Sequence, residues 1–388
     1  MTTTTPDASS DTCLLLVDLQ ERYASSATPD VCAAVAEALR RARSTGMPVV
    51  HVMHDIQAAE LVRSNPRLRY VAETHARGYG EHHLVPLACS WPLEGETVVM
   101  KRSFDSFYKT GLDAQLRKRG VRRILVCGLL TGMCVLSTTL SAFARGYEVT
   151  LLRDATNDDD ARRYRVVRCV YPEVSRVSDV RSALREGSTP ERARQLLNRH
   201  APSVHADPAE RAPPPVGGVL LVLNPTSLYM TPEQRAQLEE LGERYRAGGG
   251  RVYRVHTDTS ASGGSSAAFQ RLFGRPLQLQ TRARAAAGDG DDDVAVNVAS
   301  SAVFDGPQRT GLHHVLRKAG VGQVAIAGAL GGLQVLQALL DAFNRQLWVV
   351  IVTDRLFDTH ADRRLVTIES YDGQLCTGLT SRELLKAI

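Results

Sequence analysis

The feature that most constrains this chain is an internal repeat: its second half passes through the same short motifs as its first, in the same order. Matched positions lie 200 residues apart over most of the repeat and 206 apart near its start. Two copies of one folding unit explain this register, and 388 residues are enough for two domains with separate cores. The matched pairs are Gly120 and Gly320, Gly128 and Gly328, Leu112 and Leu312, Asp154 and Asp354, Asp18 and Asn224, and Tyr23 and Tyr229.

Within each copy, short apolar runs alternate with amphipathic helical patterns. Apolar strands that alternate with helices are typical of a parallel sheet covered on both faces. The sequence therefore predicts an α/β fold, a three-layer α/β/α arrangement around a doubly wound, mostly parallel sheet of the Rossmann type, in two tandem copies. In the first copy the apolar runs are 14–17, 48–52, 97–100, 124–127 and 147–152, and the helical patterns are 31–45, 111–120 and 134–146.

Changes in composition mark the boundaries of the two copies. Residues 1–11 are mostly Thr, Ser and Asp, and we predict that they form a disordered tail. Residues 200–216 contain an Asp-Pro pair and a run of three prolines, which is typical of a semi-extended linker. We therefore predict one domain at 12–199 and a second at 217–388.

The composition excludes several classes of protein. Hydrophobic residues make up 43% and charged residues 23% of the chain, which is ordinary for a globular protein. No apolar run approaches the roughly 18 residues of a membrane span, and the N-terminus lacks a secretory signal pattern. The net charge of +5 comes without a dense basic block, so we expect neither a nucleic-acid nor a membrane partner. Seven cysteines without zinc-like spacing favour a reduced, cytoplasmic setting.

Three chemically capable residues follow predicted strands of the first copy. Asp18 and Lys101 come directly after apolar runs, and Cys134 follows a third run through a short turn. The carboxyl ends of parallel strands meet at one edge of a sheet, where ligands bind. The pattern also places Cys134 at the start of a helix, where the helix dipole favours a thiolate. We expect an acid, an ammonium and a sulfur nucleophile to meet at this edge.

The motifs around these residues resemble those of the isochorismatase-like cysteine hydrolases, a superfamily that includes nicotinamidases, N-carbamoylsarcosine amidohydrolases, ureidoacrylate hydrolases and isochorismatase. The resemblance implies that Asp18, Lys101 and Cys134 form the catalytic triad. It also implies a cis peptide between Leu129 and Leu130, which aims the backbone N–H groups of Leu130 and Cys134 at an oxyanion. The motifs are 16–23 (LVDLQERY), 101–110 (KRSFDSFYKT), 128–135 (GLLTGMCV), 142–147 (AFARGY) and Asp154-Ala155.

The substrate itself is a small molecule whose pocket the sequence outlines only loosely. No cofactor is expected. We also expect no metal, because 51–55 (HVMHD) reverses the Asp-x-His order of nicotinamidases, His82-His83 is an ordinary loop pair, and the acidic stretch 289–293 lacks the pattern of a calcium loop. The candidate substrate contacts are Gln20, Tyr23, His54, Trp91, Phe107 and Thr131.

The second copy lacks the chemistry of the first. In the repeat register Asp18 corresponds to Asn224, Lys101 to Ser301 and Cys134 to Gln334. An amide cannot accept the thiol proton, and glutamine offers no nucleophilic sulfur. We expect a catalytically inactive pseudo-domain that forms an internal pseudo-dimer with the first domain, with further homo-oligomers left open.

The leading interpretation is a cysteine-dependent hydrolase of a small amide, carbamoyl or ureido substrate, acting through a thioester on Cys134. Three alternatives stay open at this point. The same thioester could be taken by an amine in a bacterial biosynthetic pathway. A vinyl ether of the isochorismate type could be hydrolysed by acid catalysis from Asp18 without a nucleophile. The first domain could also be a non-catalytic binding or scaffold protein.

Overall fold

A computed structural model of the chain describes residues 11–55, 84–184, 195, 218–224, 230–257, 293–298, 304 and 312–388. The predicted tail at 1–10 and the predicted linker at 200–216 lie outside the described residues, so their conformation stays a prediction. The same holds for Tyr229, Ser301, His82-His83 and most of the acidic stretch 289–293.

The first half of the chain forms a six-stranded sheet in which every pair of neighbouring strands is parallel. Its spatial order is β3-β2-β1-β4-β5-β6, so the chain reverses direction across the sheet between β1 and β4. The strands are β1 (Thr12–Val17), β2 (Val49–His54), β3 (Thr97–Lys101), β4 (Arg123–Leu129), β5 (Glu148–Asn157) and β6 (Arg176–Ser178).

The second half forms another six-stranded parallel sheet with the order β12-β11-β10-β7-β8-β9, which is the order of the first sheet read from its opposite edge. The predicted α/β fold with mostly parallel, doubly wound sheets is therefore confirmed. The strands are β7 (Val219–Leu223), β8 (Arg251–Thr257), β9 (Asp293–Val298), β10 (Gln323–Ala329), β11 (Trp348–Phe357) and β12 (Thr377–Leu379).

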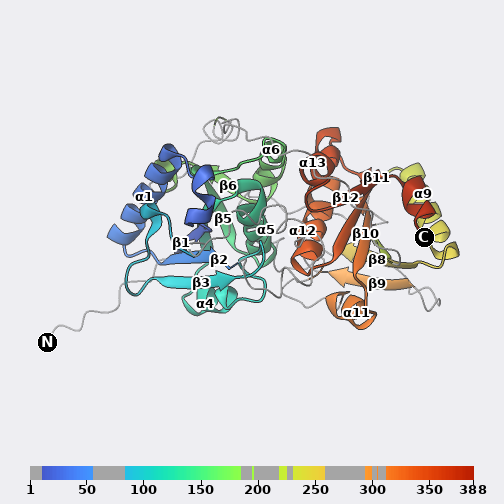
Figure 1. The fold of residues 1–388 in the computed structure, drawn as a ribbon, viewed down its shortest axis with the longest axis horizontal. Helices are drawn as coiled ribbons and strands as arrows, with labels where there is room; N and C mark the ends of the chain where they lie inside the picture. Colours follow the sequence, from blue (N-terminus) through green and yellow to red (C-terminus); the bar gives the residue numbers. More distant parts are fainter. Residues whose placement is uncertain are drawn as a thin grey trace.

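Helices cover both faces of each sheet, as Figure 1 shows. Helix α1 begins where Thr28 accepts a hydrogen bond from the backbone of Val31, with Pro29 at its first position, and its buried residues recur at helical spacing. In the first half the helices are η1 (Glu21–Ser26), α1 (Pro29–Ser44), η3 (Ala88–Ser90), α4 (Leu112–Lys118), η4 (Thr131–Val135), α5 (Leu136–Ala144), α6 (Arg163–Val174) and α7 (Val180–Ala183). In the second half they are α9 (Pro232–Ala247), α11 (Leu312–Lys318), η5 (Gly331–Val335), α12 (Leu336–Asn344), α13 (Ala361–Tyr371) and α14 (Ser381–Lys386).

The two halves also share unusual backbone features at matched positions. Asp18 and Asn224 both have a positive φ, at 53° and 48°. A cis peptide precedes Leu130 in the first half, as expected, and another precedes Leu330 in the second. Each cis peptide leads into a short π-helical turn, η4 and η5, respectively. These shared details support the prediction that one folding unit is present twice.

One pair of glycines is required by this geometry. Gly128 has a φ of 122°, and a Cβ at this position would lie 2.0 Å from the carbonyl oxygen of Val17. Gly328 has a φ of 123°, with the same close approach to Leu223. Only glycine tolerates both the left-handed conformation and the close contact, because every other residue carries a Cβ. The two strands can therefore converge at the sheet edge in both halves.

The halves pack against each other through helices near the middle of the molecule. Figure 1 shows α5 and α6 on one side of this boundary and α12 and α13 on the other, whereas α1 and α9 cover the outer faces of the two sheets. Buried side chains from both halves form one continuous apolar cluster, which includes Phe143 and Val170 from the first half and Leu339 and Phe343 from the second. The boundary is thus part of the hydrophobic core.

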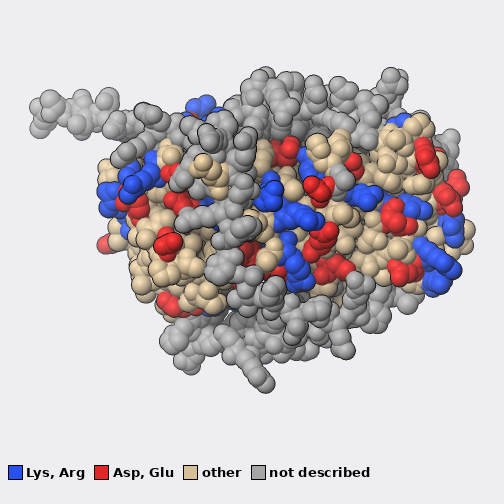
Figure 2. Space-filling model, turned by 90° about the horizontal axis from the view of Figure 1, so that it is seen from above, with Lys and Arg blue, Asp and Glu red and all other residues tan. Residues whose placement is uncertain are grey.

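The surface carries a mixture of charges. In Figure 2 the basic and acidic side chains are interspersed on the face that is seen from above. Within the described ranges, no helix has both the length and the apolar character that a membrane span requires.

Candidate active site

The order of the strands brings four reactive side chains to one edge of the first sheet. Asp18 follows β1, His54 ends β2, Lys101 ends β3, and Cys134 follows β4 through the turn η4. All four lie at the carboxyl ends of parallel strands, next to the β1/β4 point where the strand order reverses. This is where doubly wound sheets bind ligands.

Asp18 and Lys101 form a fully buried ion pair. The Lys101 Nζ lies 2.9 Å from Oδ2 of Asp18, and both side chains have no exposed surface. The same ammonium donates to the carbonyl oxygens of Ser103 at 3.0 Å and Phe104 at 2.9 Å. Two backbone carbonyl oxygens and the Asp18 carboxylate therefore surround the ammonium. The long side chain of Lys101 reaches past β2, which lies between β3 and β1.

Cys134 completes the cluster from the turn η4. Its side chain is 4% exposed, and its Sγ lies within 4.8 Å of ligand atoms of Asp18 and His54. The residue sits inside the π-helical turn, which continues without a break into α5 from Leu136, so Cys134 lies in the opening turn of a helical segment that begins at Thr131. The structure thus brings together all three residues of the predicted triad.

The electrostatics of the cluster differ from the sequence-based expectation of a resting thiolate. Burial raises the pKa of Cys134, and the negative charge of Asp18 raises it further, whereas Lys101 lowers it. The resting state is therefore a thiol, which must lose its proton to a neighbouring base. Burial also raises the pKa of Asp18, although Lys101 opposes this shift. Burial lowers the pKa of Lys101, but the negative charge of Asp18 offsets this, and the pKa lies above its ordinary value.

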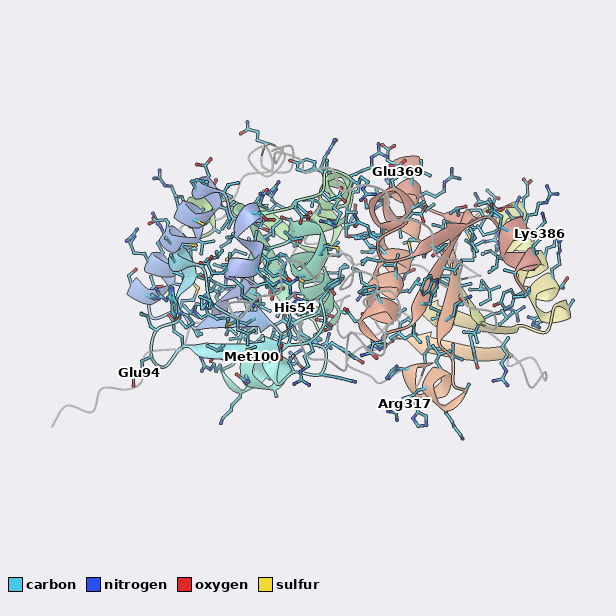
Figure 3. All side chains as sticks on the ribbon, in the orientation of Figure 1. His54, Glu94, Met100, Arg317, Glu369 and Lys386 are labelled. Carbon is cyan, nitrogen blue, oxygen red and sulfur yellow. The ribbon has the colours of Figure 1, made fainter. Side chains whose placement is uncertain are left out.

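His54, Gln20 and Tyr23 form a hydrogen-bonded group beside the triad. The side-chain amide of Gln20 forms two hydrogen bonds with the backbone of His54. It accepts from the His54 N–H at 2.7 Å and donates to the His54 carbonyl at 3.2 Å. The Tyr23 hydroxyl lies 3.1 Å from Nδ1 of His54, and this Nδ1 lies 4.0 Å from Asp18. Burial and the charge of Lys101 hold the pKa of His54 well below its usual value, so the ring is neutral. Its Nε2 is buried and has no hydrogen-bond partner among the described residues. Figure 3 labels His54 at this sheet edge.

Leu130 and Thr131 belong to the turn that carries the thiol. The Leu130 carbonyl accepts from the N–H groups of Met133 and Val135 at 3.1 and 3.2 Å, which closes the turn. The Thr131 hydroxyl bonds that of Thr156 at 2.8 Å, and its carbonyl accepts from Tyr171 at 2.7 Å. Thr131 therefore anchors the turn, and its hydroxyl is directed toward β5.

The structure contradicts one predicted substrate contact, Trp91, and places another, Phe107, in the core. Trp91 is 56% exposed, and its carbonyl accepts from Arg43, in the last turn of α1, which places it at the amino edge of the sheet, away from the triad. Phe107 is buried and stacks on Tyr147 at 5.9 Å between ring centroids, so it contributes to the core.

The matched site of the second half is occupied by its own side chains. Oε1 of Gln334, at the position of Cys134, accepts from the Leu330 N–H at 3.4 Å and from Asn224 Nδ2. Asn224 also donates to the carbonyl of Ala329 at 3.1 Å. The amide oxygen of Gln334 thus takes the N–H that corresponds to the oxyanion donor predicted at Leu130. Ser301, which corresponds to Lys101, lies outside the described residues.

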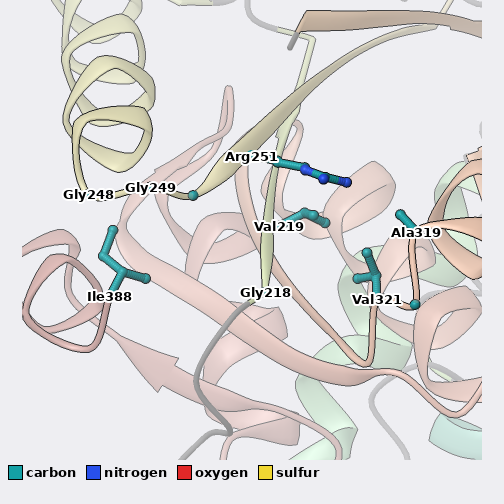
Figure 4. A pocket seen from close by; sticks show the side chains of 10 residues that line it. Gly218, Val219, Gly248, Gly249, Arg251, Ala319, Val321 and Ile388 are labelled. Atoms are coloured by element: carbon teal, nitrogen blue, oxygen red, sulfur yellow. The ribbon is translucent and has the colours of Figure 1, made fainter.

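A separate hollow of about 250 Å³ opens at the opposite edge of the second sheet (Figure 4). It lies at the amino ends of β7 and β8, and its lining includes Gly218, Gly249 and Ile388. Arg251 is the one charged side chain among its lining residues. The hollow therefore offers no nucleophile and no acid.

Asp18, His54 and Cys134 could each offer one ligand atom to a metal ion, because these atoms lie within 4.8 Å of one another. However, the Lys101 ammonium lies 2.9 Å from the Asp18 carboxylate. A cation bound there would repel this buried positive charge at short range. The donor set fits proton transfer better than metal binding.

A thiol, a carboxyl group and an ammonium buried together at the switch point of a parallel sheet define a site of the cysteine hydrolase class. The family model described as "Isochorismatase domain" matches residues 12–167, which contain all three. The chain is 31% identical over 150 residues to the uncharacterised isochorismatase family protein YddQ of Bacillus subtilis, covering 37% of this chain and 76% of that protein. The chain therefore belongs to the isochorismatase family.

Other relatives carry names with a stated activity. The ureidoacrylate amidohydrolase RutB of Variovorax paradoxus is 31% identical over 179 residues, which cover 38% of this chain and 69% of that protein. Among solved structures, the N-carbamoylsarcosine amidase of Thermoplasma acidophilum aligns with a TM-score of 0.36 and 24% identity, over 44% of this chain and 96% of its own. A cysteine hydrolase from Pseudomonas syringae aligns with a TM-score of 0.41 and 20% identity, over 50% of this chain and 97% of its own.

Sequence reasoning missed residues of the second half that contact the loops carrying Lys101 and Cys134. Asn344 bonds the backbone of Phe104, and Tyr371 bonds that of Gly132. One signal was available, since Tyr371 lies 200 residues after Tyr171, which also contacts the turn that carries Cys134. This match predicts a contact with the turn only if the two halves are known to pack together, and no local motif shows that packing.

Proposed function

We propose that this protein hydrolyses a small amide, carbamoyl or ureido substrate through a thioester on Cys134. The observation that carries the proposal is the buried contact among Asp18, Lys101 and Cys134 at the sheet edge. Such a cluster can remove a thiol proton and stabilise the ions that form, away from bulk water.

In the first step the Asp18 carboxylate accepts the proton of the Cys134 thiol. The sulfur then forms a bond to the substrate carbonyl carbon, whose oxygen becomes an oxyanion. The backbone N–H groups of Leu130 and Cys134 stabilise this oxyanion, and loss of one such donor costs about 3–4 kcal/mol in comparable sites. Lys101 keeps a positive charge beside the forming thiolate, and two carbonyl oxygens and the Asp18 carboxylate fix the position of its ammonium.

In the second step the carbon–nitrogen bond breaks, and the proton held by Asp18 passes to the departing nitrogen. An acyl group now remains on Cys134 as a thioester. Water gives a proton to Asp18 and attacks the thioester carbon, after which the carbon–sulfur bond breaks. The product is an acid, and the thiol regains the proton from Asp18, so the enzyme returns to its starting state.

The substrate class rests on the chemistry of the site and on the relatives. The buried Nε2 of the neutral His54 ring can bond a polar group of the substrate, and Gln20 and Tyr23 hold the ring in place. Relatives named ureidoacrylate amidohydrolase and N-carbamoylsarcosine amidase act, by their names, on ureido and carbamoyl compounds. A small ureido or carbamoyl compound is therefore the first substrate to test.

The test is to incubate the full chain with a set of small amides that includes ureidoacrylate and N-carbamoylsarcosine. Ammonia release and the mass of the intact protein are measured together. We expect turnover of at least one compound and an acyl adduct on Cys134. Cys134→Ala should lose all turnover, whereas Cys32→Ala, which changes a half-buried cysteine on α1, should keep it.

Other outcomes would contradict the proposal. Full turnover by Cys134→Ala would favour acid catalysis by Asp18, as expected for a vinyl ether of the isochorismate type. Products that contain an added amine would indicate acyl transfer. The absence of both turnover and adduct across the set would favour a binding protein.

A further inference from the structure

The loop that holds the Lys101 ammonium is itself held by the second half. The carbonyl groups of Ser103 and Phe104 accept two of the three ammonium hydrogens. The N–H of Phe104 donates to Oδ1 of Asn344 at 3.1 Å, and the Phe104 ring stacks on Phe343 with 5.2 Å between ring centroids. The ammonium position thus depends on two residues at the end of α12.

The turn that carries Cys134 is also held from the second half. The Tyr371 hydroxyl, at the end of α13, donates to the carbonyl of Gly132, two residues before Cys134. The N–H of Gly132 donates to Asp158 at 2.5 Å, and Asp158 pairs with Arg163 at 2.8 Å. Tyr371 is fully buried, so this contact lies inside the protein core.

These contacts are not the same in both directions. Asn344 is 6% exposed and also donates to the Ser137 hydroxyl at 3.2 Å. The matched position in the first half is Ala144, which has no polar side chain to return the contact. At this matched position, only the second half supplies a side chain, Asn344, that forms hydrogen bonds to the other half.

We propose that Asn344 and Tyr371 are positioning residues of the catalytic site, through which the second half sets the geometry of Lys101 and Cys134. This inference rests on the proposed function of the triad. Asn344 fixes the carbonyls that receive the ammonium, and Tyr371 fixes the turn that presents the thiol. A catalytic group displaced by about 1 Å can lose up to 10²-fold in rate.

The test uses the full chain and p-nitrophenyl acetate, a small activated acyl compound whose nitrophenolate is released as the acetyl group moves to Cys134. Tyr371→Phe removes only the hydroxyl, and Asn344→Ala removes both of its hydrogen bonds. We expect kcat to fall by about tenfold or more in each variant while KM changes by less than about twofold, because position and not binding is lost.

The matched control is Glu369→Gln. It breaks the ion pair between Arg165 and Glu369, which also joins the two halves but lies between exposed side chains, with Glu369 at the surface in Figure 3. This variant should keep the wild-type kcat. Circular dichroism and thermal unfolding of all three variants separate a loss of position from a loss of folding.

Two results are distinguishable. If the wild-type protein gives acetyl-Cys134 and Tyr371→Phe and Asn344→Ala match Glu369→Gln in kcat, the positioning inference is overturned and the proposed function stands. If the folded wild-type protein forms no acetyl-Cys134 at all, the proposed function fails, and the inference fails with it.

Discussion

The buried ion pair between Lys101 and Asp18 makes a prediction that combines stability with pH. Lys101→Met removes the ammonium and leaves a fully buried carboxylate without its partner at 2.9 Å. Removing one member of such a pair costs about 3–5 kcal/mol, because the remaining charge is uncompensated. The double variant Asp18→Asn with Lys101→Met removes both charges and should cost less than the sum of the two single changes.

The pH dependence follows from the direction of the Asp18 shift. Burial already raises the pKa of Asp18, and loss of the Lys101 ammonium, which lowers it, will raise it further. A carboxyl group with a raised pKa in the folded state holds its proton more tightly there. Its contribution to stability is complete below its unfolded pKa of about 4 and is lost as the pH rises through the folded value. The deficit of Lys101→Met should therefore be small near pH 4 and grow toward neutral and alkaline pH.

The assay is urea unfolding of the wild-type chain, both single variants and the double variant at acidic and mildly alkaline pH. The reasoning would be refuted by a Lys101→Met deficit that is equal at both pH values. Strict additivity of the two single changes would also refute it, since the two charges would then not interact in the folded state.

Two further predictions concern the strand-end geometry and the second site. Gly128→Ala should abolish folding or cost more than about 4 kcal/mol of unfolding free energy, because its Cβ would lie 2.0 Å from the Val17 carbonyl oxygen. Gly120→Ala has nothing within 4 Å of its Cβ and should cost about 1–2 kcal/mol, from the strain of its positive φ alone. Urea unfolding compares the two variants, and equal costs would contradict the geometry. Gln334→Ala should keep wild-type turnover but lower the free energy of unfolding by about 1–3 kcal/mol, because it leaves the Leu330 N–H without this acceptor. A fall in turnover would show that the second site takes part in the reaction.

The sequence was sufficient to place the triad because each of its members follows an apolar run. Parallel strands have their carboxyl ends at one edge, so Asp18, Lys101 and Cys134 had to face the same region once the runs were identified as strands. The helical segment begins at Thr131, a few residues before the predicted start at Cys134, because a π-helical turn has no distinctive residue pattern.

The substrate contacts were harder to predict because they depend on which edge of the sheet a loop reaches. Trp91 lies in a loop between strands, and nothing in the sequence says that Arg43 holds this loop at the amino edge. Phe107 lies in a family-like motif, yet its stacking partner Tyr147 is distant in sequence. Gln20 was a better choice because it follows β1 two residues after Asp18 and reaches the end of the neighbouring strand β2.

The second half separates what this fold needs from what the reaction needs. Gly328, the positive φ of Asn224 and the cis peptide before Leu330 persist where no thiol is present. These features therefore belong to the way a strand and a turn meet at the sheet edge, and they do not require catalysis to explain them.

What differs between the matched sites is their side-chain chemistry. Asn224 replaces the acid, and Gln334 replaces the thiol and bonds the Leu330 N–H with its own amide oxygen. Because Gln334 already accepts from the Leu330 N–H, this donor is not left for a substrate oxygen. The same half contributes α12 and α13 to a core shared with the triad, and Asn344 and Tyr371 bond the loops that carry Lys101 and Cys134. Packing against the half that carries the predicted triad is thus a sufficient physical reason for the second half to keep this fold.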